Sequence, residues 1–199
     1  MLTSWQRDRA EIISRAIKEK NNQTVSVGDI ACGEGSILKY IGERNDTSGL
    51  YGYDVSQYAL NAAKELGINT QLFDINIWAD FDKLEVVDYY LMLEILEHIG
   101  ESERALAKIL EKTNKGVFFS FPNSGYFPFR LRLLFGKFPK QWNMFPNEHL
   151  RYWTYADLKW WLKAQGFTNY TIHTYRGIPF LSNIWPSVFA AAFVIELDK

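Results

Sequence analysis

The segment from Val25 to Gly35, VSVGDIACGEG, most limits what this chain can fold into. A β-type run leads there into a turn that holds an acidic residue and two glycines, Gly33 and Gly35, and a stretch with a helical pattern follows. Glycine permits a tight turn at positive φ and lets a ligand approach the main chain, while the first turn of a helix offers unpaired N–H groups. About twenty residues later, Asp54 ends the next predicted strand, where a carboxylate can accept both hydroxyl hydrogens of a ribose. Together the two segments predict a site for a cofactor that contains a nucleoside.

The spacing of the glycines distinguishes between classes of cofactor. A dinucleotide site needs G-x-G-x-x-G, and reading from Gly33 places Leu38 where the third glycine would stand. A nicotinamide-dependent oxidoreductase is therefore disfavoured. The order Asp29-x-Ala31-x-Gly33-x-Gly35 instead resembles the D-x-G-x-G-x-G motif of class I S-adenosylmethionine (SAM) dependent methyltransferases, with Ala31 in place of the first glycine. The alternative, an ordinary strand-to-helix loop, is weakened because an acidic residue follows at the expected distance.

Runs of β-branched and aromatic residues alternate with helical stretches, which indicates a parallel sheet with helices on both faces. We expect strands at residues 24–31, 48–54, 69–74, 86–92, 116–121, 167–175 and 188–197, and helices at 4–20, 35–44, 56–66, 102–113 and 154–165. Ser4 and Ser56 stand where helix caps are expected, and Gly67 and Gly166 where helices end. The sequence thus predicts one α/β domain over residues 1–199, Rossmann-like and doubly wound, with a mostly parallel seven-stranded sheet.

Two further segments strengthen the resemblance to these methyltransferases. Asp74 follows the third predicted strand and resembles the residue that contacts the adenine amino group, while the stretch from Val87 to Ile99, VDYYLMLEILEHI, resembles the motif that lines the methionine moiety. The alternatives are that Asp74 caps a turn and that Glu94, Glu97 and His98 form a solvated helix face. The resemblance implies SAM as the cofactor and assigns to it Asp29, Ala31, Cys32, Gly33, Gly35, Asp54, Val55, Asp74, Ile75, Leu93 and Glu94.

The segment from Ser120 to Leu158 narrows the resemblance. It carries SFPN, two arginines in a helical stretch, a loop rich in proline and aromatic residues, and N-x-H-L ahead of the next helix. This combination is similar to the MetW family (methionine biosynthesis protein W). The matching residues are Ser120, Phe121, Pro122, Asn123, Arg130, Arg132, Pro146, Asn147, His149 and Leu150. The resemblance covers most of the chain and implies a SAM-dependent methyltransferase, with relatives that resemble enzymes of sugar and cell-surface biosynthesis.

Residues 121–153 combine ten aromatic residues with five lysines or arginines and one acid. They are predicted to form a lid insertion, approximately residues 122–153, after the fifth strand. Phe127, Leu131, Leu134 and Phe135 fall on one face of a short helix. Three explanations stay open: a lid held by packing, a cover over an anionic acceptor such as a phosphate or nucleotide-linked sugar, and a surface for a homodimer or a partner enzyme. The candidate acceptor-binding residues are Asn123, Tyr126, Arg130 and His149.

Methyl transfer from a sulfonium requires positioning and, for an O–H or N–H acceptor, a base. His149 is the candidate base, because a neutral imidazole can take a proton near neutral pH. The alternative is a histidine that only fixes the lid by hydrogen bonding, and His98 is expected to anchor a loop in that way. No metal site is predicted, since the three histidines lack ligand spacing and Cys32 is the single cysteine.

Composition limits the remaining possibilities. A net charge of −1 and a pI near 6.3 disfavour nucleic acid as a partner, so a small-molecule acceptor is expected. One cysteine excludes an intramolecular disulfide and suggests the cytoplasm, and the longest apolar run, residues 188–195, is too short to cross a membrane. The second functional hypothesis is a SAM-binding regulatory or partner subunit with little catalytic activity.

Overall fold

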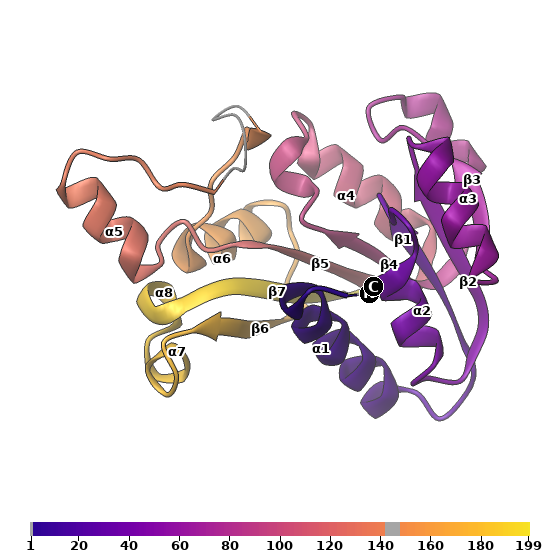
Figure 1. Ribbon diagram of the computed structural model, residues 1–199, viewed down its shortest axis with the longest axis horizontal. Helices are drawn as coiled ribbons and strands as arrows, with labels where there is room; N and C mark the ends of the chain where they lie inside the picture. Colours follow the sequence, from indigo (N-terminus) through magenta and orange to yellow (C-terminus); the bar gives the residue numbers. More distant parts are fainter. Residues whose placement is uncertain (1, 142–147) are drawn as a thin grey trace. The chain divides into compact units, whose positions relative to one another are not determined.

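The computed structural model describes residues 2–141 and 148–199 (Figure 1). The chain divides into two compact units. Unit 1 comprises Met1–Leu93, Glu103–Phe118 and Asp198–Lys199, and unit 2 comprises Glu94–Ser102 and Phe119–Leu197. Seven strands form one sheet in the order β3-β2-β1-β4-β5-β7-β6. This confirms the predicted Rossmann-like architecture, while the single domain over residues 1–199 stays a prediction.

Parallel pairing organises the strands of unit 1. They are β1 (Val25–Ile30), β2 (Thr47–Asp54), β3 (Asn69–Leu72), β4 (Val87–Leu93) and the first part of β5 (Thr113–Pro122). β1 pairs in parallel with β2 and with β4, and β2 pairs in parallel with β3. The carboxyl ends of β1, β2 and β4 therefore lie at one edge of the sheet, where ligands bind in such folds.

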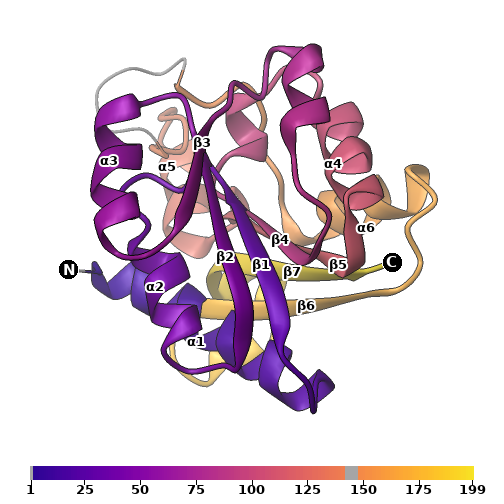
Figure 2. The ribbon, with the colours of Figure 1, turned by 90° about the vertical axis from the view of Figure 1, so that its right-hand side faces the viewer.

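Helices cover both faces of the strands of unit 1. They are α1 (Ser4–Lys20), α2 (Ser36–Gly42), α3 (Gln57–Glu65), the short 3₁₀-helix η1 (Trp78–Lys83) and α4 (Ser102–Glu111). Figure 2 shows α2 and α3 on one side of β1 and β2, and α4 on the other. Fully buried aliphatic side chains from strands and helices, among them Ile13, Val27, Leu38 and Leu106, form the core. The spacing of apolar residues within the helical stretches of the sequence reflects this burial of one face of each helix.

The helix ends agree with the predictions in three cases out of four. Ser56 caps α3 by accepting a hydrogen bond from the N–H of Ala59. Gly67 and Gly166 both have φ of +80° just beyond helix ends, a conformation that favours glycine. The prediction for Ser4 was wrong, because Thr3 is the cap: its hydroxyl accepts from the N–H of Gln6, whose side chain bonds back to Thr3. The helix therefore begins at Ser4, as predicted, and its cap lies one residue earlier than predicted.

Unit 2 contains an antiparallel pair of strands and an aromatic core. Its elements are η2 (Leu96–His98), the last part of β5, α5 (Phe127–Leu134), α6 (Tyr155–Ala164), β6 (Tyr170–Gly177), α7 (Leu181–Ile184), α8 (Pro186–Phe189) and β7 (Ala190–Asp198). β6 and β7 run antiparallel. The last strand begins at Ala190 rather than at 188, since α8 occupies the preceding residues. Phe121 stacks on Trp153 with ring centroids 4.7 Å apart, and Trp153 contacts Trp161.

The predicted short helix in the lid is present as α5, but its apolar face is not buried. No residue of α5 is buried, and the side chains of Leu134 and Phe135 are 76% and 74% exposed. The lid residues Pro146 and Asn147, which belong to the resemblance with MetW, lie outside the described residues.

Candidate functional site

The turn between β1 and α2 has the backbone that its glycines predicted. Ala31, Gly33 and Gly35 have φ of +59°, +55° and +75°. A Cβ on Gly35 would lie 2.4 Å from Cδ1 of Ile68, whereas a Cβ on Gly33 would meet no atom within 4 Å. Gly35 is thus required by packing, and Gly33 faces open space. Ala31 adopts the left-handed conformation although it carries a Cβ, which costs about 1–2 kcal/mol.

Asp54, at the end of β2, is bonded to this turn. Its Oδ2 accepts a hydrogen bond of 2.8 Å from the N–H of Gly33, and its Oδ1 accepts one of 2.9 Å from the N–H of Ser56. Each carboxylate oxygen has a second lone pair, so the two amides leave acceptor capacity for a ligand. The residue predicted to bind the ribose therefore also fixes the backbone of the glycine turn.

A cavity of about 360 Å³ opens beside the turn in unit 1. Its lining residues are Gln6, Arg9, Asp29, Ala31, Cys32, Gly33, Glu34, Ser36, Ile37 and Leu93. Five of the residues predicted for the cofactor, namely Asp29, Ala31, Cys32, Gly33 and Leu93, belong to this lining. The structure thus brings the ends of β1 and β4 together around one cavity, as the parallel topology predicted.

The contribution of α1 to the cavity was missed. Gln6 and Arg9 line it, and Arg9 is only 9% exposed. A signal was present in the sequence, because Arg9 shares the buried face of α1 with Ile13 and Ile17, at intervals of four residues. An arginine within an otherwise apolar helix face indicates a buried partner or a ligand.

Two titratable groups in the cavity are strongly perturbed. Burial raises the pKa of Asp29 to about 8, against the opposing effect of the Arg9 guanidinium. Burial likewise raises the pKa of the Cys32 thiol, as do the carboxylates of Asp29 and Asp54. The thiol is therefore neutral. A cation that binds in the cavity would favour the ionised form of the Asp29 carboxyl group.

The other predicted cofactor residues do not line the cavity. Asp74 accepts at Oδ1 from the N–H of Asn76, so the alternative of a turn cap describes its local role. Ile75 is 7% exposed and Val55 65% exposed. Glu94 belongs to unit 2, where its φ is +55° and its carboxylate accepts from the hydroxyl of Ser120 at 2.9 Å.

Two of the predicted acceptor-binding residues have structural roles in unit 2. Asn123 is fully buried; its amide donates to the carbonyl of Ala190 at 2.8 Å and accepts from the N–H of Gly125. These bonds give Asn123 a structural role within unit 2, and its contact with an acceptor stays a prediction. Arg130 donates through Nε to the carbonyl of Gly125 at 2.6 Å. Tyr126 precedes α5 and contacts Phe129 edge to face.

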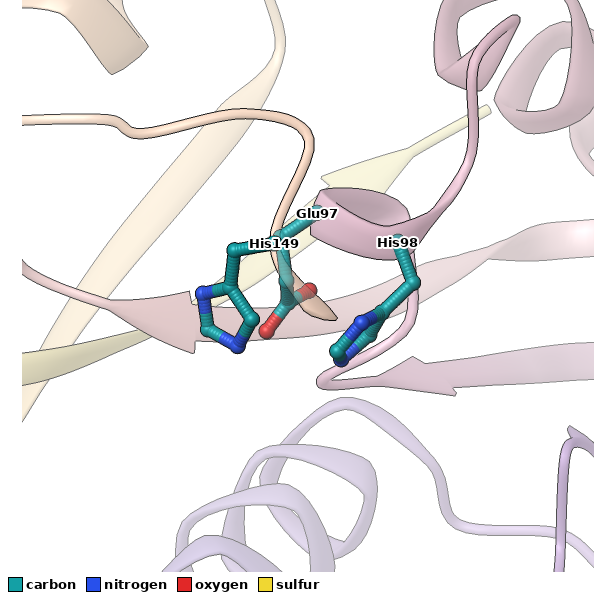
Figure 3. A group of neighbouring side chains, drawn as sticks. All are labelled: Glu97, His98 and His149. Atoms are coloured by element: carbon teal, nitrogen blue, oxygen red, sulfur yellow. The ribbon is translucent and has the colours of Figure 1, made fainter. Parts of the chain in front are cut away.

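His149 lies in a cluster with Glu97 and His98, drawn in Figure 3. The potential ligand atoms of the three side chains lie within 4.8 Å of one another. Glu97 is 1% exposed, and the rings of the two histidines meet edge to face with centroids 4.7 Å apart. The sequence analysis expected no metal site, and the spacing of residues in the sequence does not reveal a cluster whose members lie about fifty residues apart.

Hydrogen bonds hold the two segments of this cluster together. Nδ1 of His98 bonds to the carbonyl of Glu148, and the N–H of Leu150 donates to the carbonyl of Glu97 at 2.8 Å. His98 therefore anchors a loop, as predicted. Partial burial and the neighbouring His98 lower the pKa of His149, and its Nδ1 has no hydrogen-bond partner among the described residues.

Comparison with known proteins identifies the family. The model of a family described as a methyltransferase domain matches residues 4–172. No curated protein matches the chain. No helix within the described part of the chain is long and apolar enough to cross a membrane.

Solved structures share the fold at low sequence identity. The chain is similar to the small RNA methyltransferase HEN1 (TM-score 0.68, 24% identity), with 97% of this chain and 26% of HEN1 covered, so it spans about a quarter of that protein. It is similar to magnesium protoporphyrin IX methyltransferase from Synechocystis PCC 6803 with bound SAH (TM-score 0.63, 15% identity, 96% and 83% covered). A third similar structure is a possible histamine N-methyltransferase from Thermotoga maritima (TM-score 0.65, 16% identity, 98% and 91% covered).

The glycine turn, the carboxylate that fixes it and the cavity beside it agree with the family match, which covers most of the chain. The cofactor predicted from the sequence is confirmed, whereas the narrower resemblance to MetW is not. The chain belongs to the methyltransferase domain family and is a class I SAM-dependent methyltransferase.

Proposed function

We propose that this methyltransferase transfers the methyl group of SAM to a small acceptor, an anionic or sugar-linked molecule, and that it is MetW-like. The observation that carries the cofactor part is the cavity of about 360 Å³ lined by Asp29, Ala31, Cys32 and Gly33. A cavity of this size falls within the range of small-molecule sites. The proposed class of acceptor depends instead on the net charge of the chain and on the basic residues of the lid, which do not line that cavity.

The charges of the cavity suit the methionine end of the cofactor. SAM carries a sulfonium and an ammonium group, and Asp29 and Glu34 contribute carboxyl groups to the lining. A cation beside Asp29 favours the ionised form of its carboxyl group. Binding of SAM would therefore restore the negative charge of Asp29, which burial disfavours in the apo protein. The carboxylate of the methionine moiety would find the guanidinium of Arg9 on the same lining.

The transfer itself is an in-line displacement at carbon. The acceptor lone pair forms the new bond to the methyl carbon while the carbon–sulfur bond breaks, and sulfur keeps its electron pair in the demethylated product, SAH. Because the leaving group is already activated, the protein contributes mainly by positioning the two reactants.

Overall charge supports a small acceptor over a nucleic acid. The net charge of −1 provides no broad basic field, although the lid carries Arg130, Arg132, Lys137, Lys140 and Arg151. The similar solved structures differ in the molecules that they modify or bind: one is a small RNA methyltransferase, and the N-terminal domain of EvdMO1 was solved with SAH and D-fucose. A local basic segment in a weakly acidic protein suits an acceptor with one phosphate or carboxylate group.

Two measurements test the proposal. Calorimetry with purified protein should give micromolar binding of SAM and SAH and none of NADH. A panel of acceptors is then tested by release of SAH: nucleotide-linked sugars, sugar phosphates, small amines and a short RNA. Turnover of a sugar-linked or phosphorylated small molecule supports the proposed acceptor class, whereas turnover of RNA alone refutes it, and lack of SAM binding refutes the cofactor site.

A further inference from the structure

Glu97, His98 and His149 come from two segments of unit 2 that meet. Glu97 and His98 end the short helix η2 (Leu96–His98), and His149 lies near the end of the predicted lid insertion, residues 122–153. Figure 3 shows the three side chains extending to the same side of the backbone, with the carboxylate of Glu97 between the two imidazole rings in this view. Their potential ligand atoms lie within 4.8 Å of one another.

The backbone holds this arrangement independently of the three side chains. The carbonyl of Glu97 accepts from the N–H of Leu150 at 2.8 Å and of Arg151 at 3.2 Å. The guanidinium of Arg151 donates to the carbonyl of Gly100 at 2.5 Å. These bonds flank His149 and fix its segment against η2, so the cluster is preorganised rather than a chance approach of mobile side chains.

The hydrogen bonds of the histidines also favour metal ligation. Nδ1 of His98 faces the carbonyl of Glu148, and a carbonyl can only accept, so Nδ1 carries the hydrogen and Nε2 keeps its lone pair. This carbonyl–histidine arrangement is what orients metal-ligating histidines. In His149, Nδ1 is buried without a hydrogen-bond partner in the described chain, which leaves that ring free to turn one nitrogen toward an ion.

We infer that Glu97, His98 and His149 form a binding site for one divalent transition-metal ion. Two imidazole nitrogens and one carboxylate oxygen suit Mn²⁺, Fe²⁺, Co²⁺ or Zn²⁺, and leave coordination positions open. Mg²⁺ and Ca²⁺ prefer oxygen ligands and would bind weakly. Metal–ligand bonds of about 2.0–2.2 Å place neighbouring ligand atoms about 3 to 3.5 Å apart, so an ion would draw the exposed His98 ring inward by about 1 Å.

The site changes the role of His149. An imidazole nitrogen that binds a metal cannot also take a proton, so metal ligation replaces the general base predicted from the sequence. A hydroxyl group or water molecule bound to such an ion would lose its proton to bulk water more readily.

Metal binding is tested without any acceptor. The protein is prepared with every polyhistidine tag removed and dialysed against EDTA, and titrated calorimetrically with MnCl₂, ZnCl₂ and MgCl₂. We expect one Mn²⁺ or Zn²⁺ per chain with micromolar or tighter affinity, and Mg²⁺ binding at least a hundredfold weaker. Elemental analysis of the reloaded, desalted protein should give one metal per chain. Absence of binding, or a stoichiometry that does not approach one, overturns the site.

Variants locate the ion. His98→Ala, His149→Ala and Glu97→Gln should each weaken metal binding at least tenfold. His173→Gln is the control: His173, on β6, pairs with Glu196 on β7, and its variant should keep the metal affinity of the wild type within twofold. Equal effects at His173 overturn the assignment. His98 is exposed, so its variant should fold even where Glu97→Gln does not, and circular dichroism checks each. Electron paramagnetic resonance gives a second readout, since Mn²⁺ bound by wild type should lose its free-ion signal and regain it with His98→Ala.

Binding of SAM is measured on the same samples. Metal binding without SAM binding leaves the site intact and refutes the proposed cofactor function, whereas SAM binding without metal binding refutes the site alone. The two proposals are thereby separated.

Discussion

The carboxylate of Asp54 accepts a hydrogen bond of 2.8 Å from the backbone N–H of Gly33, across the adjacent carboxyl ends of β2 and β1. The residue expected to bind the ribose is therefore also the residue that orders the glycine turn. A second bond, from the N–H of Ser56 to the same carboxylate, continues this order into α3. Cofactor affinity and local stability are coupled at this position, and substitutions there must be interpreted with both in mind.

Asp54→Asn should weaken SAM binding about ten- to a hundredfold, because it removes the charge that strengthens hydrogen bonds to the ribose and to two backbone amides. The melting temperature should fall as well. Calorimetry with SAM and thermal unfolding of the apo protein measure the two effects. Asp82→Asn is the matched control, since Asp82 is exposed in η1. Wild-type affinity in Asp54→Asn would show that this carboxylate does not contact the cofactor.

Gly33→Val should abolish SAM binding. Gly33 has φ of +55° and lines the cavity, so the new methyl groups would occupy ligand space. Gly67→Val is the matched control, because Gly67 has φ of +80°, also has no atom within 4 Å of an added Cβ, and does not line the cavity. Both variants should lose about 1–2 kcal/mol of stability from backbone strain. Loss of SAM binding in both would mean that binding follows general stability.

Ala31→Gly should stabilise the apo protein by about 0.5–1 kcal/mol. Its φ of +59° costs an L-residue about 1–2 kcal/mol, and the greater freedom of glycine in the unfolded chain offsets part of the gain. Chemical denaturation measures the difference. SAM affinity should be equal to or better than that of wild type, because the backbone needs no new conformation. Destabilisation by this change would show that the Ala31 methyl group packs favourably.

Stability of the apo protein should depend on pH through Asp29. Its folded pKa of about 8 exceeds its usual value near 3.9, so between these values the folded state holds a proton that the unfolded state has lost. Stability therefore falls as pH rises, by up to about 1.4 kcal/mol per pH unit, and the loss is complete above the folded pKa. Asp29→Asn should remove this slope. Denaturation of wild type and variant from pH 5 to 8 measures the free energy of unfolding. The same dependence on pH in both proteins would contradict the prediction.

Arg130→Ala should lower stability by about 1 kcal/mol and leave SAM affinity within threefold. The guanidinium bonds to the carbonyls of Gly125 and Ser187, and each such bond contributes on the order of 1 kcal/mol or less at a partly exposed site. Lys140→Ala, in the same lid, is the control for loss of a positive charge. An unchanged melting temperature in Arg130→Ala would favour the role in acceptor binding that was predicted from the sequence.

Local sequence signals were sufficient for the sheet, the glycine turn and the cofactor. Glycines, caps and alternating apolar runs act over a few residues, and the order of strands and helices determines which strand ends meet. The turn at Gly33 and the partner carboxylate of Asp54 were therefore both predictable. The start of β7 was harder to predict, because the apolar run from 188 to 195 is compatible with either a short helix or a strand.

Only the tertiary structure decided which side chains share a site. Arg9 lines the cavity because of where α1 packs. The buried side chain of Asn123 donates to the carbonyl of Ala190, far along the chain. His149 joins Glu97 and His98 through hydrogen bonds between segments about fifty residues apart. Such contacts depend on how distant backbones pack, which no local pattern encodes. The sequence by itself determined the fold and its cofactor; packing determined the partners of each catalytic or structural side chain.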